Sequence, residues 1–126
     1  MQISTITFTT NKDVILVSMH GLYELKPDQD QSEFEQAFTA YAKQLNEMGL
    51  NIGWQSFSRR PHQGYNLMPP EQHGLVAMYF EDDEQANRCW DVVATDDEPI
   101  ASLHRGVNQK VTNISFFYSD VNTHNV

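Results

Sequence analysis

Histidine is the side chain best suited to acid–base chemistry near neutral pH, and His20 lies within the apolar run Val14–Leu25, four residues before Glu24. In a strand, residues separated by an even number project from the same face, so His20 and Glu24 share one face. A neutral imidazole in a partly apolar cavity, held by a carboxylate, can act as a general base. We therefore predict that His20 is a catalytic base and that Glu24 contributes to substrate binding. The alternative is a core or dimer-interface histidine with one hydrogen bond.

A second histidine, His104, is followed four residues later by Asn108. On a helix this spacing brings both side chains to one face. The asparagine can orient the imidazole or bind a substrate carbonyl, while the histidine transfers a proton. The pair therefore predicts a catalytic His104 and a substrate-binding Asn108, near His20 or at the mouth of the cavity. The alternative is that Asn108 fixes the loop before the last strand, a role in which asparagine is common.

Trp54, Arg59 and Arg60 bracket another predicted strand in a chain with few basic residues. An arginine fork suits a carboxylate or phosphate on a small ligand, and an indole offers a flat apolar wall. These residue types predict substrate-binding roles for Trp54 and Arg59. The alternative for the arginines is ion pairing with the abundant surface carboxylates.

The spacing of potential metal ligands does not indicate a metal centre. His20, Glu24, His73 and His104 are donors in principle, but none of them forms the closely spaced pair typical of zinc motifs. The single cysteine, Cys89, belongs to an apolar helical stripe and is predicted to be a small buried hydrophobe. We therefore predict no metal and no cofactor.

These residues are distributed over elements that alternate between strands and helices. The clearest helix begins near Ser32, where Ser32-Glu33-Phe34-Glu35 matches a capping box, and it ends at Gly49, a residue suited to the left-handed conformation. A second helix is capped by Asp82 or Asp83, and a short third helix begins at Pro99. The predicted strands are Val14–Leu25, Leu50–Arg59, His73–Phe80 and Val111–Tyr118.

The order strand–helix–strand, strand–helix–strand predicts an α+β fold of ferredoxin-like, split βαβ topology, with the helices on one face of an antiparallel sheet. Alternation places His20 and Leu22 on the other face, together with Tyr79. Such a mixture is typical of a cavity lined between two sheets, and it makes Tyr79 a candidate substrate-binding residue. Because this face would otherwise expose Leu16, Leu22, Leu75 and Tyr79, we predict a homodimer.

The 126 residues are predicted to form a single domain over 1–126, with an arm or extra strand at 1–12 and a flexible tail at 121–126. The net formal charge of −9 argues against nucleic acid and anionic membranes as partners, because both attract clustered Lys and Arg. A single cysteine excludes an internal disulfide framework. No apolar run is long enough to span a membrane and no leader pattern is present, so the sequence predicts a cytoplasmic protein.

The stretch HGLYELKPDQDQSEFEQAFTAY resembles the opening of dimeric α+β barrel proteins, namely the stress-responsive barrels and their antibiotic-monooxygenase-like relatives. In that superfamily a strand bearing a histidine runs into Lys-Pro and then into a capped helix. The resemblance continues through GLNIGWQSFSRR and YFEDDEQANRCW and covers most of residues 14–120. The segment DEPIASLHRGVNQKVTNISFFYSDV is similar to a bacterial group of such barrels with no assigned activity.

The sequence departs from the plant-type stress barrel, which carries a His-Pro-x-His element after its second helix. Here Glu98-Pro99-Ile100-Ala101 stands in that place, so a role that rests on that histidine pair does not carry over. The superfamily that the sequence resembles includes cofactor-free oxygenases, heme-degrading enzymes, dehydratases, muconolactone isomerase-type enzymes and proteins of no known activity.

The candidate residues and the resemblance together favour a small-molecule enzyme that performs cofactor-independent acid–base chemistry on an organic ligand in a barrel cavity. The alternative is a non-catalytic dimeric barrel that binds a small ligand or takes part in a stress response. Catalysis by His20 requires that it lie beside a cavity that water can enter, whereas a structural role leaves it packed and dry.

Overall fold

Seven elements make up residues 16–61 and 72–122, which are the residues that the structure, a computed structural model, describes. In chain order they are β1 (Val17–Leu25), α1 (Gln31–Glu47), β2 (Gly53–Ser58), β3 (Gly74–Phe80), α2 (Asp83–Ala94), α3 (Ile100–Asn108) and β4 (Val111–Asp120). Each corresponds to a predicted strand or helix. The predicted arm at 1–12 and the last four residues of the predicted tail lie outside the described residues.

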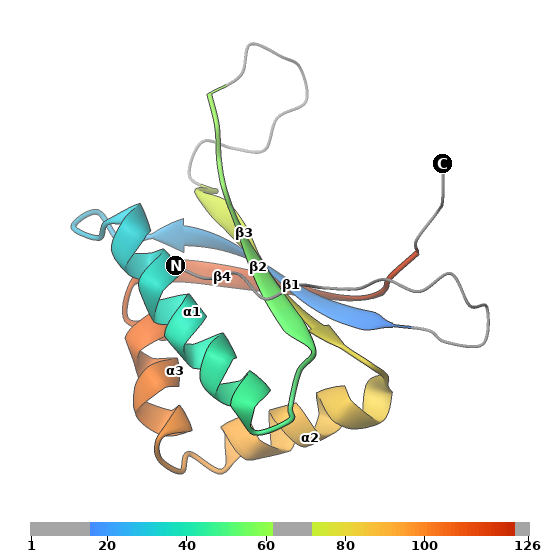
Figure 1. The fold of residues 1–126 in the computed structure, drawn as a ribbon. Helices are drawn as coiled ribbons and strands as arrows, with labels where there is room; N and C mark the ends of the chain where they lie inside the picture. The colour runs from blue at the N-terminus through green and yellow to red at the C-terminus, as the bar shows by residue number, and fades with distance from the viewer. Residues whose placement is uncertain (1–15, 62–71, 123–126) are drawn as a thin grey trace.

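The four strands form one antiparallel sheet in the order β2-β3-β1-β4. All three helices lie on the same side of this sheet, with α3 beside α1 and α2 at one end (Figure 1). The predicted α+β, ferredoxin-like fold is therefore confirmed. In this order β2 and β4 are the two edge strands, at opposite sides of the sheet.

Helix α1 follows the apolar spacing of its residues, but its N-terminal cap differs from the predicted one. The cap is Asp30, whose carboxylate accepts a hydrogen bond of 2.9 Å from the backbone N–H of Ser32, so the predicted capping box of Ser32 and Glu35 is wrong. A charged carboxylate is favoured over a hydroxyl at this position because it also meets the positive end of the helix dipole. Glu35 instead accepts a hydrogen bond from the hydroxyl of Ser58. Gly49 has a φ of +76°, the left-handed conformation predicted for it.

Helices α2 and α3 begin where the sequence predicts. Asp82 caps α2, and its carboxylate accepts a hydrogen bond of 2.8 Å from the backbone N–H of Gln85. The buried side chain of Gln85 donates to the carbonyl oxygen of Gly49 at 3.0 Å, which ties α2 to the end of α1. Pro99 directly precedes α3.

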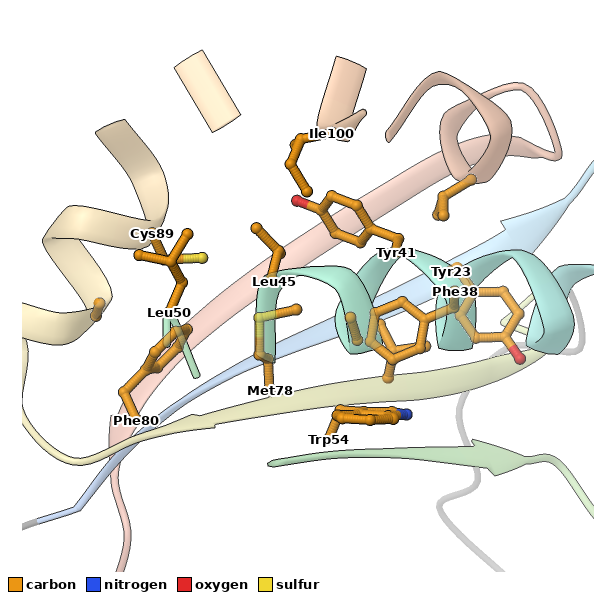
Figure 2. Packing of buried hydrophobic residues seen from close by; sticks show 14 of the residues in the cluster. Tyr23, Phe38, Tyr41, Leu45, Leu50, Trp54, Met78, Phe80, Cys89 and Ile100 are labelled. Atoms are coloured by element: carbon orange, nitrogen blue, oxygen red, sulfur yellow. The ribbon is translucent and has the colours of Figure 1, made fainter. Parts of the chain in front are cut away.

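The hydrophobic core fills the space between the helices and the sheet (Figure 2). Tyr23 of β1 stacks on Phe34 of α1 with ring centroids 4.0 Å apart, and both side chains are fully buried. Burying each large apolar side chain of this kind contributes about 1.5–3 kcal/mol. Trp54 is only 5% exposed and belongs to this core, near Phe38 of α1 (Figure 2). Its indole therefore packs against the helix rather than forming the predicted wall for a ligand.

The residues of β1 alternate between the two sheet faces as predicted. Val17, Tyr23 and Leu25 face the helices and are buried. Ser18 and His20 project from the opposite face, which carries no helix and is called the open face below. By register and alternation the open face also carries Leu22, Glu24, Gln55, Phe57, Leu75, Tyr79, Ser115, Phe117 and Ser119.

The predicted exposure of the open face is wrong at two positions. Leu16 and Tyr79 are 8% and 7% exposed. The Tyr79 hydroxyl donates a hydrogen bond of 2.6 Å to Gln55, its neighbour across β2 and β3, which satisfies the buried polar end of the ring. Large exposed apolar side chains occur instead at Phe57 of β2 and along β4.

Candidate functional site

A cavity of about 390 Å³ lies between the helices and the sheet. Its floor is formed by residues of β1, β3 and β4 and its walls by residues of all three helices. Two of the β4 residues that line it, Phe116 and Tyr118, are also exposed to solvent. The lining residues are Met19, Phe38, Tyr41, Val76, Trp90, Val93, His104, Val107, Asn108, Ile114, Phe116 and Tyr118. The volume and the mainly apolar lining suit a small organic molecule.

His104 and Asn108 place the main polar groups of this cavity on α3. Asn108 Nδ2 lies 3.2 Å from His104 Nε2, as expected for residues four apart on a helix. The imidazole also stacks on the ring of Tyr41 from α1, with centroids 5.2 Å apart and an interplanar angle of 18°. The stacking and the hydrogen bond together hold the imidazole in one orientation at the cavity.

Burial lowers the pKa of the His104 imidazole below its ordinary value of 6.5, and the carboxylate of Asp96 opposes this to a smaller extent. At neutral pH the ring is therefore uncharged. With Asn108 Nδ2 donating to Nε2, the single ring proton resides on Nδ1. Burial also raises the pKa of Tyr41, so its hydroxyl stays protonated. The cavity thus contains a neutral base, and none of the described residues that line it is charged.

Tyr118 connects β4 to α2 at the rim of the cavity. Its hydroxyl donates a hydrogen bond of 2.7 Å to the carboxylate of Asp83 at the start of α2. Partial burial and this carboxylate raise the pKa of Tyr118 to about 12. The ring is nevertheless 47% exposed, so it forms part of the opening rather than of the floor.

His20 lies on the open face, on the other side of the sheet from His104. Its Nε2 lies 2.8 Å from the hydroxyl of Ser18, which is in turn 2.8 Å from that of Ser119. The ring packs edge-on against Tyr79, with centroids 6.4 Å apart, and lies 6.5 Å from that of Phe117. Burial lowers the pKa of His20 as well. Of the two predicted places for His104 and Asn108, a position near His20 is wrong, because the sheet separates them, whereas both residues do line a cavity.

The remaining predicted site residues occupy different places. Glu24 and Tyr79 share the open face with His20, while Trp54 belongs to the core. Arg59 lies beyond the end of β2, where its guanidinium donates to the carbonyl oxygen of Gln72 at 3.2 Å. Of the seven residues predicted for the site, only His104 and Asn108 line the cavity beneath the helices.

Tyr41, Phe116 and Tyr118 line the cavity but were not predicted as site residues. The alternation of Ile114, Phe116 and Tyr118 along β4 is a signal that could have placed them on one face. The position of Tyr41 beside His104 follows from the packing of α1 against α3, which no local pattern reveals.

Within residues 16–61 and 72–122, no three His, Cys, Asp or Glu side chains gather closely enough to hold a metal ion. Cys89 is buried beside the cavity wall, and burial raises the pKa of its thiol to about 12, which keeps it protonated. No described helix combines the length and apolarity needed to cross a membrane.

Comparison with known proteins gives a family and a fold. Residues 17–122 match the sequence profile of a family of unknown function (DUF6614), and no curated protein matches the chain in sequence. Many solved structures have a similar fold.

Three of these structures illustrate the kinds of protein that share this fold. SnoaB from Streptomyces nogalater, a cofactor-independent oxygenase, is 8% identical with a TM-score of 0.59, and the match covers 88% of this chain and 95% of SnoaB. A dimeric ferredoxin-like protein of unknown function from Thermobifida fusca is 9% identical with a TM-score of 0.58, covering 92% of this chain and all of that one (100%). A hypothetical protein from Arabidopsis thaliana is 9% identical with a TM-score of 0.59, covering 87% of this chain and 91% of that one. At these identities the similarity shows the fold, which agrees with the superfamily that the sequence resembles.

Proposed function

We propose that this chain, which belongs to the family of unknown function DUF6614, is a small-molecule enzyme that performs acid–base chemistry without a bound cofactor. The observation that carries the proposal is the neutral imidazole of His104 at a mainly apolar cavity of about 390 Å³. A partly buried base with a lowered pKa is unprotonated and able to accept a proton near neutral pH. The cofactor-independent oxygenase among the proteins of similar fold is consistent with this class of chemistry.

The lining of the cavity favours an uncharged and largely apolar substrate. Aromatic and aliphatic side chains from α1, α2 and β4 would bury its body, and the lining residues that the structure describes include no charged side chain to neutralise an ionic group. One polar, acidic position of the substrate would face His104 and Asn108. We therefore propose a molecule with a single activated C–H or O–H group.

In this proposal the substrate displaces the amide of Asn108 from His104 Nε2, and the freed lone pair of Nε2 accepts the substrate proton as a general base. Once displaced, the amide nitrogen of Asn108 is free to donate a hydrogen bond to a substrate oxygen. The stacked ring of Tyr41 keeps the imidazole in place during the transfer. The base is thus His104, whereas His20, predicted for that role, is separated from the cavity by the sheet.

The test uses a nitrobenzisoxazole, a general reporter of bases in apolar sites. A base removes its carbon-bound proton, the N–O bond breaks, and a coloured cyanophenolate forms. Positioned bases accelerate such steps by about 100-fold to 10,000-fold, so His104→Gln should lose at least about 100-fold in rate. His20→Gln is the matched control and should retain the native rate.

A second measurement separates catalysis from simple ligand binding. Fluorescence of the neutral dye phenylnaphthylamine reports occupation of the cavity, and Val93→Trp, which fills it from α2, should abolish the signal. If the dye binds but His104→Gln leaves the rate on nitrobenzisoxazole unchanged, the protein is a non-catalytic binder and the proposed enzyme is wrong.

We further propose that a second copy of the chain packs along the edge strand β4, beside the cavity. Phe116, Phe117 and Tyr118 are 60%, 62% and 47% exposed on this edge strand, an unusual concentration for a surface that faces water. The dimeric protein of similar fold supports this assembly. Light scattering at micromolar concentration should give the mass of a dimer, and Phe117→Glu should give a monomer. A monomeric native protein would exclude this arrangement.

A further inference from the structure

Two hollows meet at the end of β2, away from the cavity that contains His104. One has a volume of about 300 Å³ and lies on the open face; the other has about 430 Å³ and lies beside the start of α1. Ser58, Arg59 and Arg60 line both of them. Neither shares a described lining residue with the cavity beneath the helices.

The hollow beside α1 presents hydrogen-bond donors and positive charge. Arg59 and Arg60 contribute guanidinium groups, and Arg60 forms no ion pair with any residue in the described ranges. In contrast to Arg60, Arg88 and Arg105 are paired with carboxylates. His73 Nδ1 accepts a hydrogen bond of 2.9 Å from the Leu25 backbone, so its ring proton resides on Nε2, which is a further donor.

The hollow on the open face is apolar. Phe57, Leu75 and Leu22 are direct register partners across β2, β3 and β1, and they form a row that leads to the arginines. Phe57 at the outer end of this row is 45% exposed. An apolar row that ends at two guanidinium groups is complementary to an amphiphilic anion, which has an apolar body and a negatively charged head.

We propose that this place binds a small amphiphilic anion, with its carboxylate or comparable anionic head between Arg59 and Arg60 and its apolar body along Phe57, Leu75 and Leu22. Arginine is suited to such a head because its planar fork donates two parallel hydrogen bonds. The chain carries a net charge of −9, so an anion is repelled by most of its surface and requires a local cluster of this kind.

Two carboxylates lie near this site: Glu24, which follows Leu22 by two residues on the open face, and Glu35 of α1. Glu35 accepts hydrogen bonds from Ser58 and from Gln31, which occupy it on the α1 side of the hollow. Its charge disfavours an anion close to α1. The head of the ligand is therefore placed on the side of Arg60, away from the helix.

The experiment follows the fluorescence of anilinonaphthalene sulfonate, an amphiphilic anion, when it is added to the full chain. Arg60→Gln should weaken its binding about tenfold, the effect expected from removing one charge-assisted hydrogen bond. Leu75→Asp should weaken it at least as much, by placing a like charge beside the apolar body of the probe. Decanoate should displace the probe, whereas decanol at the same concentration should not.

Arg88→Gln on α2 is the matched control, because it removes the same charge from a different surface and should leave the binding unchanged. Val93→Trp separates this site from the cavity of His104 and should also leave it unchanged. Equal weakening in Arg60→Gln and Arg88→Gln would show that only net charge matters and would overturn the proposal. If Val93→Trp is the only variant that loses binding, the probe occupies the cavity of His104. This result would also overturn the proposal.

Discussion

Replacing Asn108 by aspartate is expected to reverse the direction in which the pKa of His104 is shifted. In the native protein burial lowers this pKa, and Asn108 Nδ2 lies 3.2 Å from His104 Nε2. Asn108→Asp places a negative charge at the same position with little change in shape. A carboxylate beside an imidazole favours the protonated ring, so the pKa should rise.

The separation of the two groups sets the magnitude. At the 3.2 Å of the native pair, two unit charges attract by about 1.3 kcal/mol in bulk water and by about 5 kcal/mol at an effective dielectric constant of about 20. Since one pKa unit corresponds to about 1.4 kcal/mol, these limits give a rise of about 1 to about 4 units. Both side chains are partly exposed to solvent, so we expect the lower end, about 1 unit.

The assay is an NMR titration of the histidine rings, in which the His104 signal is assigned by its loss in His104→Gln. Asn108→Ala removes the amide without adding a charge and is the matched control. His20 is an internal reference, because it lies on the other side of the sheet and should not respond. The midpoint of the rate against pH with nitrobenzisoxazole should rise together with the His104 pKa. An unchanged His104 pKa in Asn108→Asp, or an equal shift of His20, would refute the reasoning.

Three further predictions concern stability. In Gly74→Ala the added Cβ would overlap a backbone carbonyl of β2 and a buried tyrosine ring. The free energy of unfolding should therefore fall by about 1–3 kcal/mol, with a lower urea midpoint. An unchanged midpoint would contradict the close packing at this glycine. Leu45→Ala in the core should lose about 2–5 kcal/mol, whereas the exposed Met48→Ala at the end of the same helix should change stability by less than about 0.5 kcal/mol in the same urea experiment. The pKa values of His20 and His104 are both lowered, so the unfolded chain binds protons more readily and the free energy of unfolding should fall as the pH drops below their ordinary value of 6.5. Urea unfolding at a series of pH values should show this fall, and it should flatten in the double variant His20→Gln/His104→Gln.

The elements and their order could be predicted from the sequence because their signals are local. Alternation along β1 and the steps of three and four along α1 report which side of each element is buried, and the order of elements then restricts the topology. The cap of α1 was missed for a related reason. Asp30 and Ser32 are both good caps two residues apart, and the choice between them depends on how the chain enters the helix.

The pairing of His104 with Asn108 was also within reach of the sequence, since helical spacing alone brings them together. The same spacing predicted that one face of α3 bears a catalytic and a substrate-binding side chain. It did not predict the stacking of His104 on Tyr41, because these residues are far apart in the chain and meet only where α1 and α3 pack.

What the sequence by itself determined is therefore the set of elements, the faces of each strand and the local pair on α3. Only the tertiary structure decided that His20 and His104 are separated: the helices cover a single face of the sheet, and a side chain that points inward from α3 reaches only that face. Trp54 became part of the core for the same reason, because its strand position points toward α1. The cavity itself has no local signal, since its volume is the space that side chains from three helices and three strands leave unfilled when they pack together.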